Sequence, residues 1–334
     1  MNIERLTLEE WGDALPSNGF DAFHTPGALR VLNDHSSGDT ILLGGFKGQQ
    51  AVALLPAFVR DRAVGRAVTS PPPSMNIPHM GPILMPNSPK RRKQEKLNRT
   101  FTQEVIDELD AASAQTLFRT VTTPSYDDPR PFEWADLSVE PSFTYRMDLD
   151  GVDLDDVRSA FSSSLRRDIR DAEATDAEVS VEGLTAARAV FDRMVERYED
   201  NDDTLPVTWP FVRDLVDALD ERCRVYTVRS GDGEFLSGII ALYSNDAAYF
   251  WQGGARADYQ GASVNSLLHW AIISDIVDDP ELESVHQYDL VGANTERLCK
   301  YKAKFGAQLR PYYLVESSGP SMEIAKRAYQ LVSN

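Results

Sequence analysis

The chain has 334 residues, which is long enough for two domains or one duplicated unit, each with its own core. Its formal net charge is −18, from 52 acidic and 34 basic residues, and only eight of the basic residues are lysines. Abundant carboxylates with few lysines are typical of adaptation to high salt, although an ordinary acidic protein is the alternative. Such a charge argues against general nucleic-acid binding, DNA included.

Targeting and metal signals are missing from the sequence. No stretch approaches 18 apolar residues, and the start MNIERLTLEEWGDAL lacks the basic and apolar regions of a signal peptide. Cys223 and Cys299 form neither a disulfide framework nor a metal-ligand spacing. We therefore expect a cytoplasmic, halophilic protein with no transmembrane segment, no metal site and reduced cysteines.

Hydrophobic periodicity and turn residues predict the elements of the first part of the chain. The helix that they predict over residues 90–109 opens with Lys90-Arg91-Arg92-Lys93, which either binds an anionic ligand or is a solvated helix start, the second being slightly favoured. The Pro- and Asp-rich residues 123–141 predict a crossing loop. The expected elements are helices over 8–15, 26–32 and 90–109, a hairpin over 39–47 and 50–59, and strands over 64–69, 81–84 and 115–121.

The second part repeats the order of a meander, a helix and a strand. We therefore expect an α/β fold with mixed sheets, built from two similar units over residues 1–135 and 136–334, with a ligand cleft between them. The expected strands are 143–149, 177–181, 224–228, 236–243, 247–252, 284–290 and 308–316; the expected helices are 155–174, 186–198, 210–219, 262–277, 298–305 and 322–332.

Three of the eight lysines lie between residues 300 and 304, just past a predicted strand that breaks at Gly292-Ala293-Asn294. Cationic groups at a strand end suit an anionic ligand or a developing negative charge, with a solvated helix face as the alternative. Lys300 and Lys304 lie roughly 200° from Lys302 around a helix, so we expect them to point away if Lys302 faces Asp289.

The same stretch carries a family resemblance. Tyr288-Asp289-Leu290-Val291-Gly292, followed by Tyr301-Lys302-Ala303-Lys304-Phe305-Gly306, resembles the late segment of Fem-like proteins, which belong to the GNAT acyltransferase superfamily. Weaker similarity lies upstream at residues 144–149, 166–170 and 249–255. The resemblance implies two GNAT-like units in tandem. It also implies an N-acyltransferase that moves an acyl or aminoacyl group from an activated donor to an amine, in cell-envelope or polysaccharide precursor synthesis.

The resemblance also assigns candidate site residues. Lys302 would stabilise the oxyanion or the leaving group, and Asp289 would act as an acid–base group or position the amine, unless it only caps the turn. Surface ion pairing and core packing are the alternatives for the other candidates. The candidates for substrate binding are Arg166, Arg167, Arg170, Tyr249, Trp251 and Asn294.

The donor stays open at this point. A GNAT enzyme that uses coenzyme A cradles the pyrophosphate in a loop with small residues, but here Ser263 and Asn265 stand at those positions of the segment 260–265. We therefore expect weak coenzyme A binding, no permanently bound cofactor, and aminoacyl-tRNA or acyl-CoA as donor to a small-molecule or glycan-precursor amine. The alternatives are an acetyl-CoA-dependent N-acetyltransferase of an amino sugar and a non-catalytic binding module.

Overall fold

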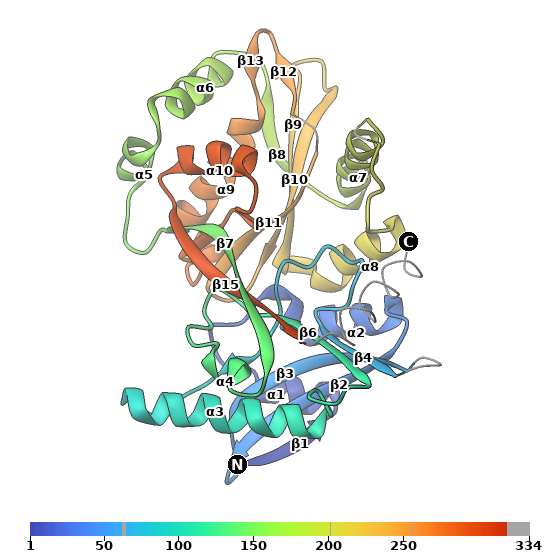
Figure 1. Ribbon diagram of the computed structural model, residues 1–334. Coiled ribbons are helices and arrows are strands. Elements are labelled where there is room, and N and C mark those ends of the chain that lie inside the picture. The colour runs from blue at the N-terminus through green and yellow to red at the C-terminus, as the bar shows by residue number, and fades with distance from the viewer. Residues whose placement is uncertain (62–64, 201, 255, 319–334) are drawn as a thin grey trace. The chain divides into compact units, whose positions relative to one another are not determined.

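The computed structural model describes residues 1–61, 65–200, 202–254 and 256–318 (Figure 1). The described chain forms two compact units. Unit 1 comprises residues 1–73, 77–142 and those from 311 onward, and unit 2 comprises residues 74–76 and 143–310. The helix expected over 322–332 lies outside the described residues. Within those residues, none of the helices combines the length and the apolar character that a bilayer span requires.

The boundary between the units falls inside a strand. Strand β7, Leu137–Asp148, begins in unit 1 and ends in unit 2, so the loop expected over residues 123–141 is shorter than predicted. Its remaining part contains the short helix α4, Arg130–Glu133. The Pro- and Asp-rich composition predicts too long a loop, because a proline such as Pro141 can stand in a strand where its missing N–H is not needed.

Unit 1 is a sheet in the order β1-β2-β3-β4-β6-β15, with β5 paired to β3. Helix α3 covers one face, where Phe101 and Val105 pack on Leu43 and Leu55. The elements of unit 1 are β1 Asn2–Leu6, α1 Leu8–Ala14, η1 Ala22–His24, α2 Pro26–His35, β2 Asp39–Lys47, β3 Gln50–Asp61, β4 Arg66–Ser70, β5 Ile83–Leu84, α3 Arg91–Glu108, β6 Thr116–Val121 and β15 Gln308–Ser317.

Unit 2 is a mixed sheet in the order β7-β14-β11-β10-β9-β8. Figure 1 shows helices α7 and α9 on opposite faces of this sheet. Its elements are α5 Leu154–Ala160, α6 Ser163–Glu173, β8 Glu178–Glu182, α7 Leu184–Glu199, α8 Trp209–Leu219, η2 Asp220–Arg222, β9 Cys223–Arg229, β10 Phe235–Tyr243, β11 Ala247–Gly253, β12 Asp258–Tyr259, β13 Ala262–Ser263, α9 Asn265–Asp278, η3 Pro280–Leu282, β14 Gln287–Asp289, α10 Glu296–Lys302 and η4 Ala303–Phe305.

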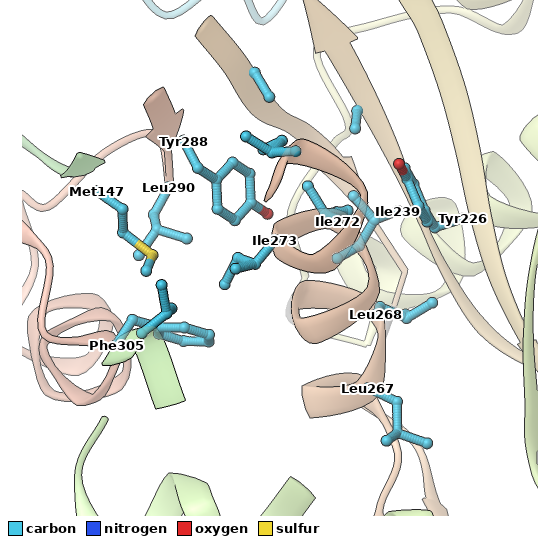
Figure 2. Close-up of a cluster of buried hydrophobic side chains, with 14 of the residues drawn as sticks. Met147, Tyr226, Ile239, Leu267, Leu268, Ile272, Ile273, Tyr288, Leu290 and Phe305 are labelled. Carbon is cyan, nitrogen blue, oxygen red and sulfur yellow. The ribbon is translucent and has the colours of Figure 1, made fainter. Parts of the chain in front are cut away.

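The core of unit 2 lies between the sheet and helices α6 and α9. Leu268, Ile272 and Ile273 of α9 pack toward Tyr288 and Ile239 of the sheet (Figure 2). Burying one such side chain fully contributes about 1.5–3 kcal/mol, so this helix is a main source of the unit's stability. The predicted helix 262–277 therefore exists, and it begins at Asn265 because residues 262–263 form β13.

The helix expected over 155–174 is interrupted. It divides into α5 and α6 at Phe161-Ser162, where the Ser162 hydroxyl accepts a hydrogen bond from Leu165 N (3.2 Å) and caps α6. Ser162 N donates to Lys304 O (2.8 Å), and a Cβ at Gly306 would lie 2.7 Å from Ala160 O. The break therefore lets the segment 303–306 approach the helix backbone.

Two parallel strands part at the centre of unit 2. Strands β11 and β14 pair only from Ala247 to Tyr249, after which β11 continues to Gly253. Strand β14 ends at Asp289, and the left-handed backbone of Val291 (φ 49°) and Gly292 (φ 76°) turns the chain away. The last residues of β11 therefore have no partner from β14.

Candidate functional site

A cavity of about 480 Å³ opens beside the last residues of β11. All of its described lining comes from unit 2, and the cleft expected between the halves stays a prediction. The described lining holds six lysines and arginines but only one carboxylate, Asp168. This excess of positive charge reverses the acidic character of the chain and favours an anionic ligand. The six basic residues are Arg167, Arg197, Arg256, Arg297, Lys302 and Lys304.

Lys302 is the buried cation of this cavity, with 4% of its surface exposed. Its Nζ donates hydrogen bonds to Val291 O and to Gly292 O, the latter at 2.8 Å, and it lies 5.8 Å from the centre of the Phe250 ring. Burial lowers the pKa of the Lys302 ammonium to about 8, and the charge of Asp289 opposes this shift. An ammonium group has three N–H donors, so one remains for a ligand.

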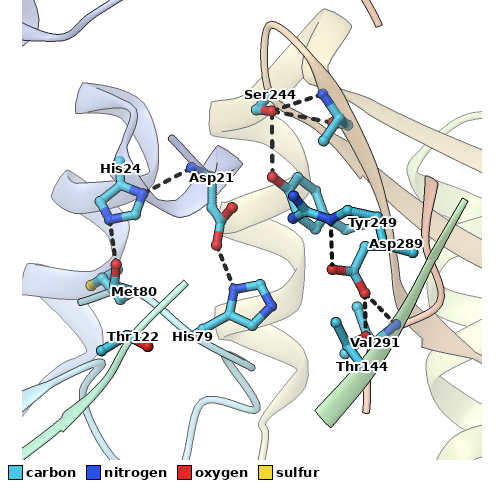
Figure 3. Close-up of polar contacts among 12 residues, drawn as sticks. Asp21, His24, His79, Met80, Thr122, Thr144, Ser244, Tyr249, Asp289 and Val291 are labelled. Atoms are coloured by element: carbon cyan, nitrogen blue, oxygen red, sulfur yellow. Dashed lines mark hydrogen bonds and ion pairs between the residues drawn. The ribbon is translucent and has the colours of Figure 1, made fainter. Parts of the chain in front are cut away.

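Asp289 holds the turn that Lys302 contacts. Its side chain is fully buried and accepts hydrogen bonds from Thr144 Oγ1 (2.5 Å), Arg146 Nε (3.3 Å) and Val291 N (2.8 Å) (Figure 3). The bond to Val291 N supports the left-handed residue whose carbonyl points at Lys302. Asp289 is not part of the described cavity lining, so it reaches Lys302 through the turn and through its charge.

The two neighbouring lysines differ from one another. Lys300 is exposed and forms an ion pair with Glu296 (2.6 Å), as expected for a residue that points away. Lys304 lines the cavity and lies 3.7 Å from Asp168, which differs from the expectation. The reason is that α10 ends at Lys302 and the 3₁₀ turn η4 follows, so the angular spacing of an α-helix does not extend to Lys304.

The expected arginines of α6 are divided in the same way. Arg167 lines the cavity, whereas Arg166 is exposed outside it and Arg170 pairs with Asp171 (3.1 Å). Three further arginines were not anticipated: Arg197 of α7, Arg256 after β11 and Arg297 of α10. They are far apart in sequence and form no local pattern, so only the fold brings them together.

The comparisons with known proteins agree with this architecture. Residues 159–303 match the family described as Acetyltransferase (GNAT) domain, and the whole fold resembles the crystal structure of FemX. The FemX match has a TM-score of 0.67 at 9% sequence identity and covers 100% of both chains. The chain therefore has the Fem-like fold, and its residues 159–303 are similar to a GNAT domain.

Two further structures share this fold, and one of them is a tandem GNAT protein. The C-terminal DUF2156 domain of a protein described as a lysylphosphatidylglycerol synthetase from Agrobacterium fabrum matches with a TM-score of 0.56 at 12% identity, over 97% of this chain and 96% of that one. A tandem GNAT protein from the clavulanic acid biosynthesis pathway matches with a TM-score of 0.51 at 11% identity, over 96% and 99%. No curated protein matches the sequence. The expected α/β fold with tandem GNAT-like units is confirmed.

Besides Arg166 and Arg170, three further candidates for substrate binding lie outside the described lining of the 480 Å³ cavity, which is called the GNAT-domain cavity below. Tyr249 and Trp251 are buried on one face of β11, with Tyr249 near Ser244 Oγ (3.4 Å) and Trp251 Nε1 donating to Asn76 O (3.0 Å). Phe250, on the opposite face, lines the cavity instead. Asn294 is exposed, and its Oδ1 accepts from Phe143 N (2.8 Å).

His269 of α9 lines the GNAT-domain cavity and was not anticipated. Its Nδ1 lies 2.9 Å from the Tyr288 hydroxyl, and the rings of Phe250 and Phe305 surround it. Burial, helped by the charge of Lys302, lowers the pKa of His269 to about 3. The imidazole is therefore neutral at physiological pH and adds a polar edge without adding charge.

The segment that corresponds to the coenzyme A loop also reaches the cavity. Ser263 at the end of β13, and Asn265 and Ser266 at the start of α9, belong to its lining. The Asn265 side chain fastens the loop, because its Oδ1 accepts from Ala257 N (2.6 Å) and its Nδ2 donates to Ser237 Oγ (2.9 Å). Asn265 therefore stabilises this loop, at the position where the coenzyme A loop has a small residue.

Proposed function

We propose that this GNAT-domain protein is an N-acyltransferase that moves an acyl or aminoacyl group from an activated ester or thioester to an amine. The observation that carries the proposal is Lys302, a buried ammonium group in the wall of a cation-lined cavity, held by two backbone carbonyls. A cation fixed in a desolvated site stabilises developing negative charge without reorganising during the reaction.

The reaction assigns a role to each group. The amine nitrogen attacks the carbonyl carbon of the donor, and the carbonyl oxygen gains a negative charge that the third N–H of Lys302 stabilises. The carbon–oxygen or carbon–sulfur bond of the donor then breaks, and the amine proton leaves to water or to the departing group. Asp289 acts as a positioning residue in this scheme, because its bond to Val291 N supports the carbonyl that orients Lys302.

The cavity charge supports an anionic portion on one of the two substrates. Both donor classes, aminoacyl-tRNA and acyl-CoA, carry phosphates that Arg167, Arg256 and Lys304 would attract. The acceptor is an amine of a small molecule or of a glycan precursor. The substrate-binding roles of Arg166, Arg170, Tyr249, Trp251 and Asn294 remain predictions.

A second candidate is an acetyl-CoA-dependent N-acetyltransferase of an amino sugar. It is favoured by the turn from β13 into α9, where Ser263, Asn265 and Ser266 line the cavity and where a pyrophosphate would need backbone N–H groups. Calorimetry separates the two candidates. Coenzyme A affinity near 1 μM, about −8 kcal/mol, would favour acetyl transfer. We expect much weaker binding, because Ser263 replaces the first glycine of the coenzyme A loop and Asn265 replaces its second glycine or alanine.

The direct test is mass spectrometry of reaction mixtures. Purified protein is incubated with pools of amine acceptors, and with charged tRNA or with acyl-CoA as the donor. Acylated amine that forms only with protein and donor together supports the proposal and identifies the donor. Saturable ligand binding with no product from either donor would overturn it in favour of a non-catalytic binding module.

A further inference from the structure

A second cavity, of about 350 Å³, lies wholly in unit 1 and plays no part in the proposed transfer. Three lysines contribute to its lining: Lys47 at the end of β2, and Lys93 and Lys96 on α3. We call these residues and the cavity they line the lysine pocket. The pocket takes up part of the basic cluster at residues 90–93, which the GNAT-domain cavity leaves unexplained.

The charge of the lysine pocket is unusual for this chain. It uses three of the eight lysines in the sequence, and its described lining includes no carboxylate. Within the described part of the chain, none of these three ammonium groups forms an ion pair, whereas Arg91 on the same helix pairs with Glu95 (3.2 Å). Ammonium groups gathered around one cavity repel one another, so the arrangement is stabilised when an anion binds between them.

The rest of the lining describes the ligand further. Asn87, Ser88 and Thr100 offer neutral hydrogen-bonding groups, while Val52 and Leu97 offer apolar surface. The ligand therefore combines an anionic group with a less polar portion. A lysine ammonium group binds phosphate as a point charge, and the described lining supplies three of them without an arginine fork.

We propose that the lysine pocket is a second binding site, which takes the phosphoryl group of a phosphorylated organic molecule. Lys47, Lys93 and Lys96 bind the phosphoryl oxygens, and the wall formed by Val52 and Leu97 holds the attached organic portion. A soluble phosphorylated metabolite and a phospholipid headgroup share this chemistry. An extended nucleic acid does not fit, because three lysines on a chain of net charge −18 form no continuous basic surface.

The test uses the full-length protein in a buffer free of phosphate and sulfate. Pyrophosphate is titrated by calorimetry, and binding to vesicles of phosphatidylglycerol is compared with binding to vesicles of phosphatidylcholine. The variant Lys93→Gln/Lys96→Gln removes two of the lining charges. Arg92→Gln is the matched control, because Arg92 is an exposed neighbour on α3 outside the described lining. Thermal melts confirm that both variants fold, and Lys302→Ala shows whether any signal comes from the GNAT-domain cavity.

We expect saturable binding of pyrophosphate, and the loss of one site or about a tenfold weaker affinity in Lys93→Gln/Lys96→Gln, with less than about a twofold change in Arg92→Gln. Binding only to phosphatidylglycerol vesicles, with the same pattern among the variants, supports the pocket with a lipid headgroup as the source. No saturable binding to either probe overturns the proposal, as does an equal loss in Arg92→Gln. These binding measurements do not depend on transfer activity, so the proposed phosphoryl site can be refuted without refuting the proposed function.

Discussion

The GNAT-domain cavity and the lysine pocket differ in how the protein holds the ammonium groups. In unit 2, Lys302 is almost fully buried and is fixed by the carbonyls of Val291 and Gly292. In unit 1, Lys93 and Lys96 are exposed and keep their side-chain freedom. A fixed, desolvated cation suits charge that develops during a reaction, whereas exposed cations suit the reversible binding of a ligand that is already charged.

The difference also appears in the cost of each arrangement. Holding Lys302 requires a buried carboxylate, Asp289, and a β-branched residue, Val291, in a left-handed conformation (φ 49°). Strained backbone of this kind costs on the order of 1–3 kcal/mol and persists only where the surroundings impose it. The exposed lysines of unit 1 need no such support. The contrast leads to predictions that separate a reacting site from a binding site.

The largest expected effect is on catalysis by Lys302→Ala. Removing the cation that stabilises the oxyanion should lower kcat by roughly 10²–10³-fold, as for the loss of one oxyanion-hole donor. The assay is steady-state transfer with the donor identified by mass spectrometry. Because the substitution also leaves two carbonyls without their Lys302 donor, thermal melts must show that the variant is folded at the assay temperature.

Lys300→Ala is the matched control for this experiment. Lys300 lies on the same helix, is exposed and pairs only at the surface with Glu296, so its removal should change kcat by less than about twofold. Lys304→Ala should show an intermediate loss, mainly in KM, because Lys304 lines the cavity beside Asp168. Equal behaviour of all three variants would contradict a special role for Lys302.

Asp289→Ala should produce the next largest effect. It removes the acceptor of bonds from Thr144, Arg146 and Val291 N, and the loss of a buried ion-pair partner costs about 3–5 kcal/mol of stability. Release of the turn should misplace Lys302 and lower kcat by about 10²-fold in the folded fraction.

Asp289→Asn tests whether this role is positional. Its amide oxygen can still accept from Val291 N, so it should recover a large part of the activity if Asp289 acts through the turn. Melts in denaturant and steady-state kinetics together check the prediction. If Asp289→Asn were as inactive as Asp289→Ala while fully folded, Asp289 would act as an acid–base group instead.

The pH dependence should distinguish Lys302 from other groups. Since the pKa of Lys302 is lowered to about 8, the protonated form that stabilises the oxyanion is lost above that pH, and the rate should fall about tenfold per pH unit. The neutral His269, with its pKa near 3, should add no limb between pH 5 and 8. If the Lys302→Ala variant still lost activity above pH 8, that loss of rate would have to come from another residue.

The same shift affects stability in a defined direction. Between about pH 8 and the unfolded lysine value of about 10.4, the unfolded chain binds more protons at this site than the folded chain does. This group therefore makes the free energy of unfolding rise with pH across that window. Denaturant unfolding of the wild type and of Lys302→Ala at several pH values checks this, because the difference between their slopes is the contribution of the Lys302 ammonium group.

Much of this architecture could be predicted from local sequence patterns. The order of helices and strands follows from hydrophobic periodicity, and the position of Lys302 follows from the motif that surrounds it. The break at Phe161-Ser162 could not be predicted, because it depends on the approach of residues 303–306, distant in sequence. Tertiary contacts override local helix propensity there.

The residues that line the cavity were harder to predict from the sequence. Tyr249 and Trp251 share one face of β11, and nothing in the alternation reveals that Phe250 on the other face lines the cavity. His269 stands in an apolar helix, where a single histidine is indistinguishable from a packing residue. Arg197, Arg256 and Arg297 come from three separate segments, so no spacing rule could have grouped them.

The smallest expected effect is that of salt on the negative charge of the protein, which is opposite in sign to the charge of both cavities. At net charge −18, self-repulsion weakens the folded state at low ionic strength, and molar KCl screens it. The melting temperature should therefore rise by more than about 5 °C from low to molar KCl, whereas a flat response would remove the halophilic interpretation.

The two cavities should respond differently to the same series of salt concentrations. Pyrophosphate binding at the exposed lysines of unit 1 should weaken as salt rises, because exposed charges are screened over about 10 Å at 0.1 M and about 3 Å at 1 M. The contribution of Lys302 to kcat, measured against Lys302→Ala at each salt concentration, should stay nearly constant, because a buried cation is screened much less.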